Sequence, residues 1–374
     1  MRKAKSYLKR IISVFLMALI VLMFMSLTQT RFDHNNIRVS GLFMEEKNSL
    51  DVILLGASEA YSGYSPVRAY QKEGITGYVF AVEDNPIKIY PSEIEEIRAY
   101  QKPKLFLIEI SGASSERNLK PNVFDATLRK YSDSVPLSMN KYQTVSKFGL
   151  DGDKISYFVP FVIYHGKMPS LDLVEEQVSL FQRGYTYSKG TVARTKTIEP
   201  DGDIIDVTGD LSKSEPDKDI LTAFDSLLDY CKTITDSKVV FVRMPHRITN
   251  DKNYLKFREG NYISDSIKNN GFDFIDFEQM KSQLGLDYNN DFADNDHLNA
   301  SGHLKLTDYL CDRIVNDYHV QPKALSDKSQ NRWNNSVKFM EKFYMYYEEK
   351  RNGGADLFLY ENKDLVSFLQ QRMK

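Results

Sequence analysis

Two short polar stretches of the sequence contain residue types that can carry out nucleophilic catalysis. Ser58 follows the apolar run Val52–Leu55, and Asp294 stands three residues before His297 within Asp291–Thr307. A carboxylate at this spacing can lie beside the imidazole and orient it, and the imidazole can then accept the proton of a serine hydroxyl. Ser58, His297 and Asp294 are therefore the candidate nucleophile, general base and orienting carboxylate.

Each of these residues also has an explanation that involves no catalysis. A serine that follows a strand can cap the next helix, and a histidine in an acidic loop can be incidental. Glu59, directly after the serine, suits the start of a helix, where the helix dipole favours an acidic side chain. The two stretches have to be considered together with the fold that would bring them to one place.

Five apolar runs predict β-strands, and helical segments separate them. Buried parallel strands are typically continuous apolar runs. Strands that alternate with helices predict an α/β protein with a doubly wound, mainly parallel five-stranded sheet, whose carboxyl edge carries the reactive groups. The predicted strands are Val52–Leu55, Gly77–Val82, Lys104–Ile110, Lys238–Met244 and Phe272–Phe277.

The serine stretch and the D-x-x-H stretch together resemble the SGNH/GDSL hydrolase superfamily, whose first block carries the serine and whose last block reads D-x-x-H. The run His297–His303, H-L-N-x-x-G-H, resembles the membrane-anchored branch, which includes the teichoic-acid D-alanylation and alginate acetylation proteins. The resemblance covers roughly residues 45–110 and 235–318. It implies a flavodoxin-like sheet and a serine esterase or O-acyltransferase that acts on O-acyl groups of a cell-envelope polysaccharide through an acyl-serine intermediate.

The sequence departs from the superfamily at the residues that bind the oxyanion. The glycine of the second block would fall near Ala81–Asp84, where no glycine occurs. The Gly-x-Asn of the third block would fall at Ser111–Ser114, which lacks the asparagine. We expect backbone N–H groups of Ser111 or Gly112 to substitute as oxyanion donors.

Two further histidines are candidates for the substrate-binding part of the site. His246 follows the fourth predicted strand and has arginines on either side that suit an anionic polymer, although a simple loop position explains it equally. His165 lies in the phrase PFVIYHGK, for which a packing role is the alternative. His303, within the helix after Ala300, is expected to be structural.

These departures leave two classes of function open. One is an enzyme, in which we expect acyl transfer to a polysaccharide or teichoic-acid-like polymer to outweigh hydrolysis. The other is a catalytically weak assembly protein that accompanies a membrane-bound O-acyltransferase. A sugar-binding module without chemistry is a third reading, but it has no need of the three candidate residues.

The first thirty residues predict a signal anchor. Five basic residues within positions 2–10 precede Ile11–Thr30, a run without charge that is almost wholly apolar at first. Each strongly apolar residue favours bilayer insertion by about 0.3–0.6 kcal/mol, and a basic flank stays in the cytoplasm. Residues 1–30 are therefore predicted to be a cytoplasmic flank and an uncleaved single-pass transmembrane helix, with the catalytic domain extracellular. A cleaved signal peptide is the alternative, but no small-x-small cleavage site follows Met25.

The rest of the chain divides into four predicted parts. Residues 31–48 are a linker, and residues 49–110 and 217–320 form the catalytic domain. Residues 111–216 interrupt the rhythm of strands and helices and are predicted to be an insertion that serves as a lid or substrate platform. Residues 321–374 are predicted to be a helical C-terminal extension that packs on the domain.

Composition limits the partners and cofactors. A formal net charge of −2 provides no bulk attraction for nucleic acid. Cys231 and Cys311 are predicted to be buried free thiols, although a disulfide between them is not excluded. No zinc or nucleotide motif occurs, so no cofactor and no metal are expected; the DGD sequences at 151–153 and 201–203 suit turns better than calcium.

Overall fold

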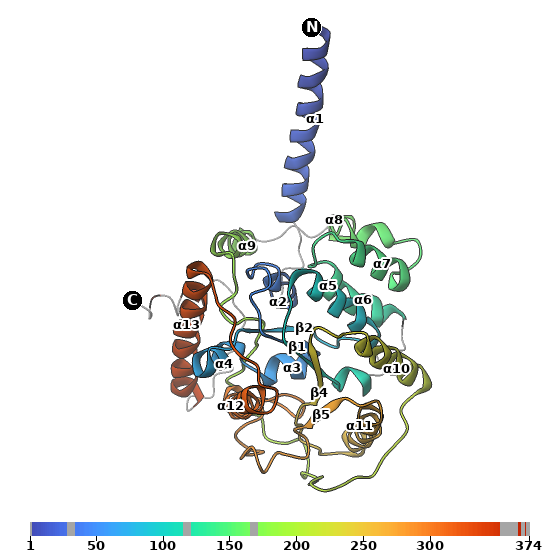
Figure 1. Ribbon diagram of the computed structural model, residues 1–374, viewed down its shortest axis with the longest axis vertical. Coiled ribbons are helices and arrows are strands. Elements are labelled where there is room, and N and C mark those ends of the chain that lie inside the picture. Colours follow the sequence, from blue (N-terminus) through green and yellow to red (C-terminus); the bar gives the residue numbers. More distant parts are fainter. Residues whose placement is uncertain are drawn as a thin grey trace.

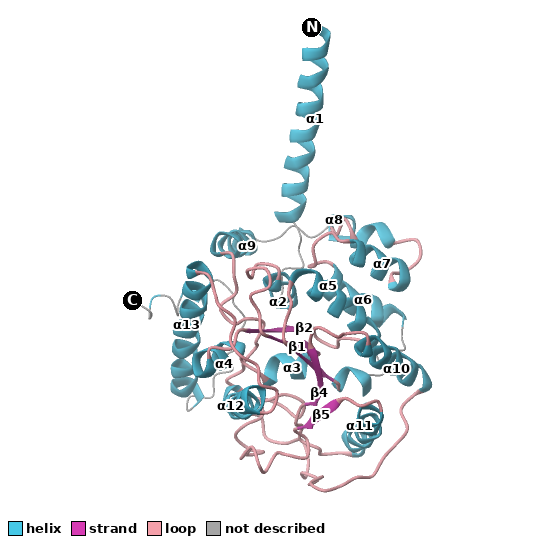
Figure 2. Ribbon diagram, in the orientation of Figure 1, coloured by secondary structure: helices cyan, strands magenta, loops and turns pink. Residues whose placement is uncertain are grey.

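The computed structural model describes residues 2–27, 34–114, 121–164, 171–351, 366–367 and 371. Its centre is a five-stranded parallel sheet with the strand order β2-β1-β3-β4-β5 (Figures 1 and 2). This order is the flavodoxin-like arrangement of doubly wound folds. The predicted α/β class and all five predicted strands are confirmed. The strands are β1 (Val52–Gly56), β2 (Gly77–Ala81), β3 (Leu105–Glu109), β4 (Lys238–Arg243) and β5 (Asp273–Asp276).

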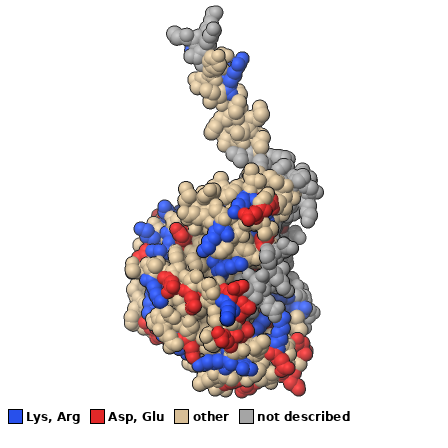
Figure 3. Space-filling view, turned by 90° about the vertical axis from the view of Figure 1, so that its right-hand side faces the viewer, with Lys and Arg blue, Asp and Glu red and all other residues tan. Residues whose placement is uncertain are grey.

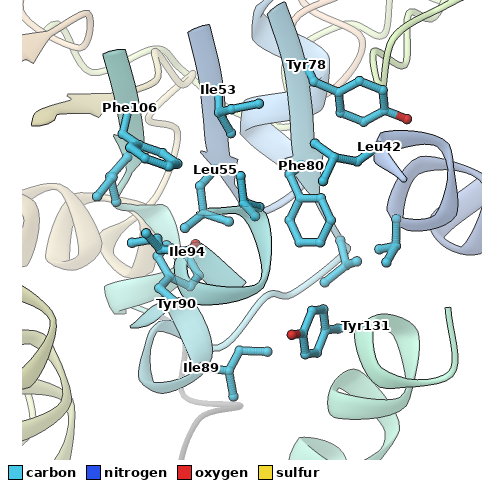
Figure 4. Packing of buried hydrophobic residues seen from close by; sticks show 14 of the residues in the cluster. Leu42, Ile53, Leu55, Tyr78, Phe80, Ile89, Tyr90, Ile94, Phe106 and Tyr131 are labelled. Atoms are coloured by element: carbon cyan, nitrogen blue, oxygen red, sulfur yellow. The ribbon is translucent and has the colours of Figure 1, made fainter. Parts of the chain in front are cut away.

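Helices lie on both faces of the sheet because alternate strand residues point to opposite sides. Ile53 and Leu55 of β1 belong to one buried apolar cluster, whereas Val52 and Leu54 belong to another. The first cluster includes side chains of α2, α5, α6, α10 and α11, and the second includes side chains of α3, α4 and α12. Figure 4 shows part of the first cluster, in which Phe80 of β2 and Phe106 of β3, on either side of β1, face helical residues. Both faces of the sheet are therefore covered, which explains why β1 and β2 and the middles of β3 and β4 are apolar, whereas the edge strand β5 carries acidic residues and is only partly buried.

The helices account for most of the remaining described residues. The α-helices are α1 (Arg2–Leu27), α2 (His34–Leu42), α3 (Ser58–Gly63), α4 (Pro66–Glu73), α5 (Tyr90–Tyr100), α6 (Pro121–Ser132), α7 (Met139–Phe148), α8 (Phe161–Tyr164), α9 (Leu171–Arg183), α10 (Lys218–Lys232), α11 (Asp251–Asn269), α12 (Ala300–Asn316) and α13 (Asp327–Arg351). Short 3-10 helices are η1 (Ile87–Ile89), η2 (Ser111–Ser114) and η4 (Lys154–Tyr157).

The prediction of a transmembrane helix is wrong. None of the helices in the described residues is both long enough and apolar enough to cross a bilayer. Helix α1 stands away from the sheet and the helices that cover it (Figure 1). Its first nine residues, 2–10, include five basic residues. The predicted single-pass location with an extracellular catalytic domain is corrected together with the helix.

The structure does not test the predicted division into domains. It shows which helices form in the predicted insertion and in the C-terminal extension. Between β3 and β4 the chain forms α6 to α9, and side chains of α6 join the first apolar cluster. Helix α13 packs beside α4, with Trp333 fully buried (Figure 1). Charged side chains of both signs are interspersed over the face shown in Figure 3. Cys231 and Cys311 are buried and free, as predicted.

Candidate active site

The carboxyl ends of four strands surround one cavity of about 420 Å³. Ser58 follows β1, Ser111 follows β3, His246 follows β4 and Glu278 follows β5, and all four line this cavity. His297, from the loop before α12, lines it as well. Open α/β sheets bind their ligands at this edge, because parallel strands end there together and the loops that follow them converge. The fold thus brings residues that are far apart in the sequence to one place.

His297 is held by Asp294 in the way that the D-x-x-H spacing predicts. The Asp294 Oδ1 atom lies 2.8 Å from His297 Nδ1 and also accepts the backbone N–H of His297 at 2.9 Å. Its other oxygen, Oδ2, is 3.0 Å from Nη1 of Arg194. His297 Nε2 is buried and has no hydrogen-bond partner in the described part of the chain. The free ring nitrogen is therefore the one that a general base needs.

The surroundings of Asp294 and His297 favour an ionised carboxylate next to a protonated imidazole. Burial alone would raise the pKa of Asp294, but the hydrogen bond and charge of His297 lower it to about 2. Burial would lower the pKa of His297, and it is overcome by the bond to Asp294 and the charge of Glu59, which raise it above its usual value. His297 thus holds a proton to a higher pH than a free imidazole does.

Ser58 is the first residue of α3, and the helix is capped by Ala57 without a side-chain hydrogen bond. The alternative in which Ser58 serves as a helix cap is therefore wrong. Its hydroxyl lies 3.1 Å from Oε2 of Glu59, so it is directed to the neighbouring carboxylate and not to His297. Ser58 and His297 line the same cavity, but the part of the chain that the structure describes contains no hydrogen bond between them. The serine hydroxyl must turn from Glu59 to reach the imidazole.

Two acidic side chains lie next to Ser58. Glu109, the last residue of β3, accepts the backbone N–H of Ala57 at 3.3 Å and that of Ser111 at 2.5 Å. Burial, and then the charge of Glu59, raise the pKa of Glu109 to about 7. Burial opposes ionisation of Glu59, but the nearby His297 and His246 outweigh it and lower its pKa. The pair therefore carries one firm negative charge, on Glu59, and a second carboxyl group that titrates near neutrality.

His246 forms a second histidine–carboxylate pair that lines the same cavity. Its Nδ1 lies 2.8 Å from Oε2 of Glu278, which also accepts the His246 backbone N–H at 2.9 Å. Lys281 Nζ binds the other oxygen of Glu278 at 2.5 Å. Burial lowers the pKa of His246, but Glu278 outweighs it and raises the value to about 9. His246 is therefore a cation at neutral pH.

The predicted oxyanion donors have different surroundings from those expected. The N–H of Ser111 donates to Glu109 and is not directed at the cavity. Gly112 lines the cavity, where a side chain would meet the backbone oxygen of Asn85 at 2.6 Å. Asn85 itself donates to Gly56 O at 3.0 Å and to Glu93 at 2.9 Å. His165 lies outside the described residues.

Sequence reasoning missed three residues that hold the site together, namely Arg194, Glu109 and Glu278. Arg194 comes from the segment between β3 and β4, and no motif marks it. The only signal for Glu109 and Glu278 is their position, since each acidic residue stands at or just after the carboxyl end of an apolar strand. His303 is buried in α12 with Nδ1 bonded to Ser62 O at 3.0 Å, so it is structural, as expected.

No protein-family model matches the chain, and no curated protein matches it either. Among solved structures, the chain is similar to an acetyl xylan esterase, Est2A, from the rumen bacterium Butyrivibrio proteoclasticus, with a TM-score of 0.29 and 9% sequence identity. The match covers 72% of this chain and 65% of that chain, so this chain spans less than two thirds of the esterase's length. A similarity of this degree does not establish a shared family or activity, so membership of the SGNH/GDSL superfamily stays a prediction.

Proposed function

We propose that the protein is a serine-dependent acyl-ester hydrolase or O-acyltransferase. Ser58 is the nucleophile, His297 the general base and Asp294 the orienting carboxylate. The observation that carries the proposal is the His297–Asp294 pair. Nδ1 of His297 lies 2.8 Å from Asp294 Oδ1, and Nε2 has no hydrogen-bond partner among the described residues. His297 lines the same cavity as Ser58. A base oriented in this way supports nucleophilic catalysis by serine, for which the Ser58 hydroxyl must turn from Glu59 to His297.

The reaction proceeds in two halves. Ser58 Oγ attacks the carbonyl carbon of the ester while His297 Nε2 accepts its proton, and the tetrahedral intermediate then expels the alcohol, which takes that proton. The product is acyl-Ser58. In the second half, water or a sugar hydroxyl attacks the acyl group and gives its proton to His297, which then passes that proton to Ser58 Oγ as the bond between Oγ and the acyl carbon breaks. Asp294 stays ionised throughout and stabilises the imidazolium that forms.

Covalent labelling tests the nucleophile directly. The full chain is incubated with a fluorophosphonate, which forms a stable adduct with activated serines, and the labelled peptide is identified by mass spectrometry. We expect modification of Ser58 and its loss in Ser58→Ala. Ser111→Ala is a matched control, because Ser111 lines the same cavity but has its hydroxyl bonded to Glu109 at 2.7 Å. Native chain that is not labelled would contradict the enzymatic function and favour a non-catalytic partner of a membrane-bound O-acyltransferase.

We further propose that the acyl group comes from or goes to a polysaccharide and that transfer outweighs hydrolysis. The resemblance of the His297–His303 run to proteins of polymer acylation supports the substrate class. In the test, the chain receives an activated acetyl ester with and without an envelope glycan, and both free acetate and acetylated glycan are measured. Acetylated glycan that requires Ser58 supports transfer. Acetate release that glycan leaves unchanged identifies an esterase.

A further inference from the structure

The proposed chemistry places a negative charge on the former carbonyl oxygen, and that charge needs hydrogen-bond donors. Several donors next to Ser58 are already used. Glu109 accepts the N–H groups of Ala57 and Ser111, and the amide of Asn85 donates to Gly56 O and Glu93. Among the described residues, these N–H and amide donors are therefore bonded to protein acceptors and do not face a substrate.

His246, at the end of β4, has the opposite arrangement. Its Nδ1 is held by Glu278 at 2.8 Å, which leaves Nε2 as the remaining polar atom of the ring. No hydrogen bond to Nε2 is made by the described residues, and the side chain lines the same cavity as Ser58 and His297. The ring is thus fixed on one side and open to the cavity on the other.

The loop that carries His246 is held independently of its imidazole. The backbone N–H of His246 donates to Glu278 at 2.9 Å, and its carbonyl oxygen accepts Lys281 Nζ at 2.9 Å. Glu278 and Lys281 are almost fully buried and are paired at 2.5 Å. A buried carboxylate that is already neutralised by a lysine still orients the imidazole, and its effect is to keep the ring protonated near neutral pH. Purely structural support of the loop does not require an imidazole here.

We propose that His246 is a second catalytic histidine, whose Nε2–H donates a hydrogen bond to the oxyanion of the tetrahedral intermediate at Ser58. The proposal rests on the proposed function, since it assigns a role within the same reaction. It gives the two histidine–carboxylate pairs different tasks at the same carbonyl group. His297 accepts the proton of Ser58, and His246 stabilises the charge that the attack creates.

The test compares His246→Phe and His246→Gln with the native chain on an activated acetyl ester. Loss of one oxyanion donor typically lowers kcat by about 10²–10³-fold, so His246→Phe should show that loss with a nearly unchanged KM. His246→Gln retains an amide donor and should recover part of the rate. The inhibition constant of a trifluoromethyl ketone, which forms a tetrahedral adduct with serine, should rise in each variant by about the factor by which kcat/KM falls.

Lys252→Gln is the control, because Lys252 lines the same cavity and its removal takes away a positive charge without disturbing the His246–Glu278 pair. It should change kcat less than tenfold. A native chain that is labelled at Ser58 but whose kcat is unaffected by His246→Phe would overturn this inference alone. An equal loss in Lys252→Gln would also overturn it, because the effect would then be one of general charge. A native chain that neither is labelled nor cleaves the ester would overturn the proposed function as well.

Discussion

At the scale of the residue, the two carboxylates Asp294 and Asp296 differ in their contact with His297. Both line or adjoin the cavity near His297, but only Asp294 is bonded to Nδ1 of the imidazole. Arg194 fixes the second oxygen of Asp294 at 3.0 Å, so the carboxylate has one orientation. In the proposed reaction Asp294 sets the tautomer of His297, and we expect that a neighbouring charge does not replace it.

Asp294→Asn should lower kcat by about 10³–10⁴-fold, because an amide can donate to Nδ1 and stabilise the wrong tautomer of the base. Steady-state kinetics on an activated ester measure the effect. Asp296→Asn is the matched control and should retain kcat within about threefold, since its side chain is not bonded to the His297 ring. Similar losses in both variants would show that charge near the imidazole matters and orientation does not.

Glu59→Gln should move the acid limb of the kcat/KM profile to lower pH. His297 must be neutral to accept a proton, so the rate rises as the pH passes its pKa. In the native chain the charge of Glu59 helps to raise that pKa above the usual 6.5, so the limb lies above this pH, and removal of the charge lowers it. Asp84→Asn is the control, because Asp84 lines the cavity and is not a cause of the raised pKa of His297. A limb that stays in place would contradict the electrostatic account.

At the scale of the element, the segment between β3 and β4 matters because it runs along the edge of the sheet and then reaches the site. Lys189 O accepts the N–H of Val79 in the edge strand β2 at 3.0 Å. Five residues later, Arg194 binds Asp294 through its side chain, and its carbonyl oxygen accepts the N–H of Ala300 at 2.9 Å. The loop that carries Asp294 and His297 is thus supported by a segment that belongs to no strand of the sheet.

Gly190→Ala should destabilise the protein and reduce activity. Gly190 has a φ of +86°, and a Cβ there would lie 2.0 Å from Val79 O, so the segment would have to move away from β2. We expect a loss of more than about 2 kcal/mol in the free energy of unfolding, measured by denaturant titration.

Gly209→Ala provides the comparison for that variant. Gly209 has a similar φ of +78°, but nothing lies within 4 Å of the added Cβ. Its cost should be limited to the backbone strain of about 1–2 kcal/mol. Equal losses in the two variants would mean that contact with β2 contributes nothing.

At the scale of the whole molecule, the two terminal helices of the described chain differ in what they contribute. Helix α13 places Trp333, Phe339 and Phe343 in the apolar cluster on one face of the sheet. Helix α1 contributes no described side chain to either cluster, and its apolar residues with described side chains are exposed, Ile11 and Phe15 by more than 60%. The stability of the sheet and of the helices packed on it should therefore depend on α13 and not on α1.

Trp333→Ala should lower the free energy of unfolding by about 3–5 kcal/mol, because a fully buried indole leaves a cavity that its neighbours cannot fill. Deletion of residues 1–27 should leave the unfolding temperature of the body unchanged. Thermal unfolding followed by circular dichroism measures both. A large loss on deletion of α1, or a negligible one in Trp333→Ala, would refute this division of roles.

The sequence by itself determined the strands, the parallel sheet and the position of Ser58 and His297 at its edge. Those features depend on local patterns, namely continuous apolar runs, the turn after β1 and the D-x-x-H spacing. Only the tertiary structure decided that Glu109 accepts the N–H of Ser111, one of the two expected oxyanion donors, that Glu278 pairs with His246, and that Arg194 supports Asp294. The contacts of Glu278 and Arg194 join segments far apart in the chain and are set by how the loops pack, so no local pattern records them. The prediction of a transmembrane helix from the charge-free run of residues 11–30 was wrong, since none of the helices in the described residues is both long and apolar enough to cross a bilayer.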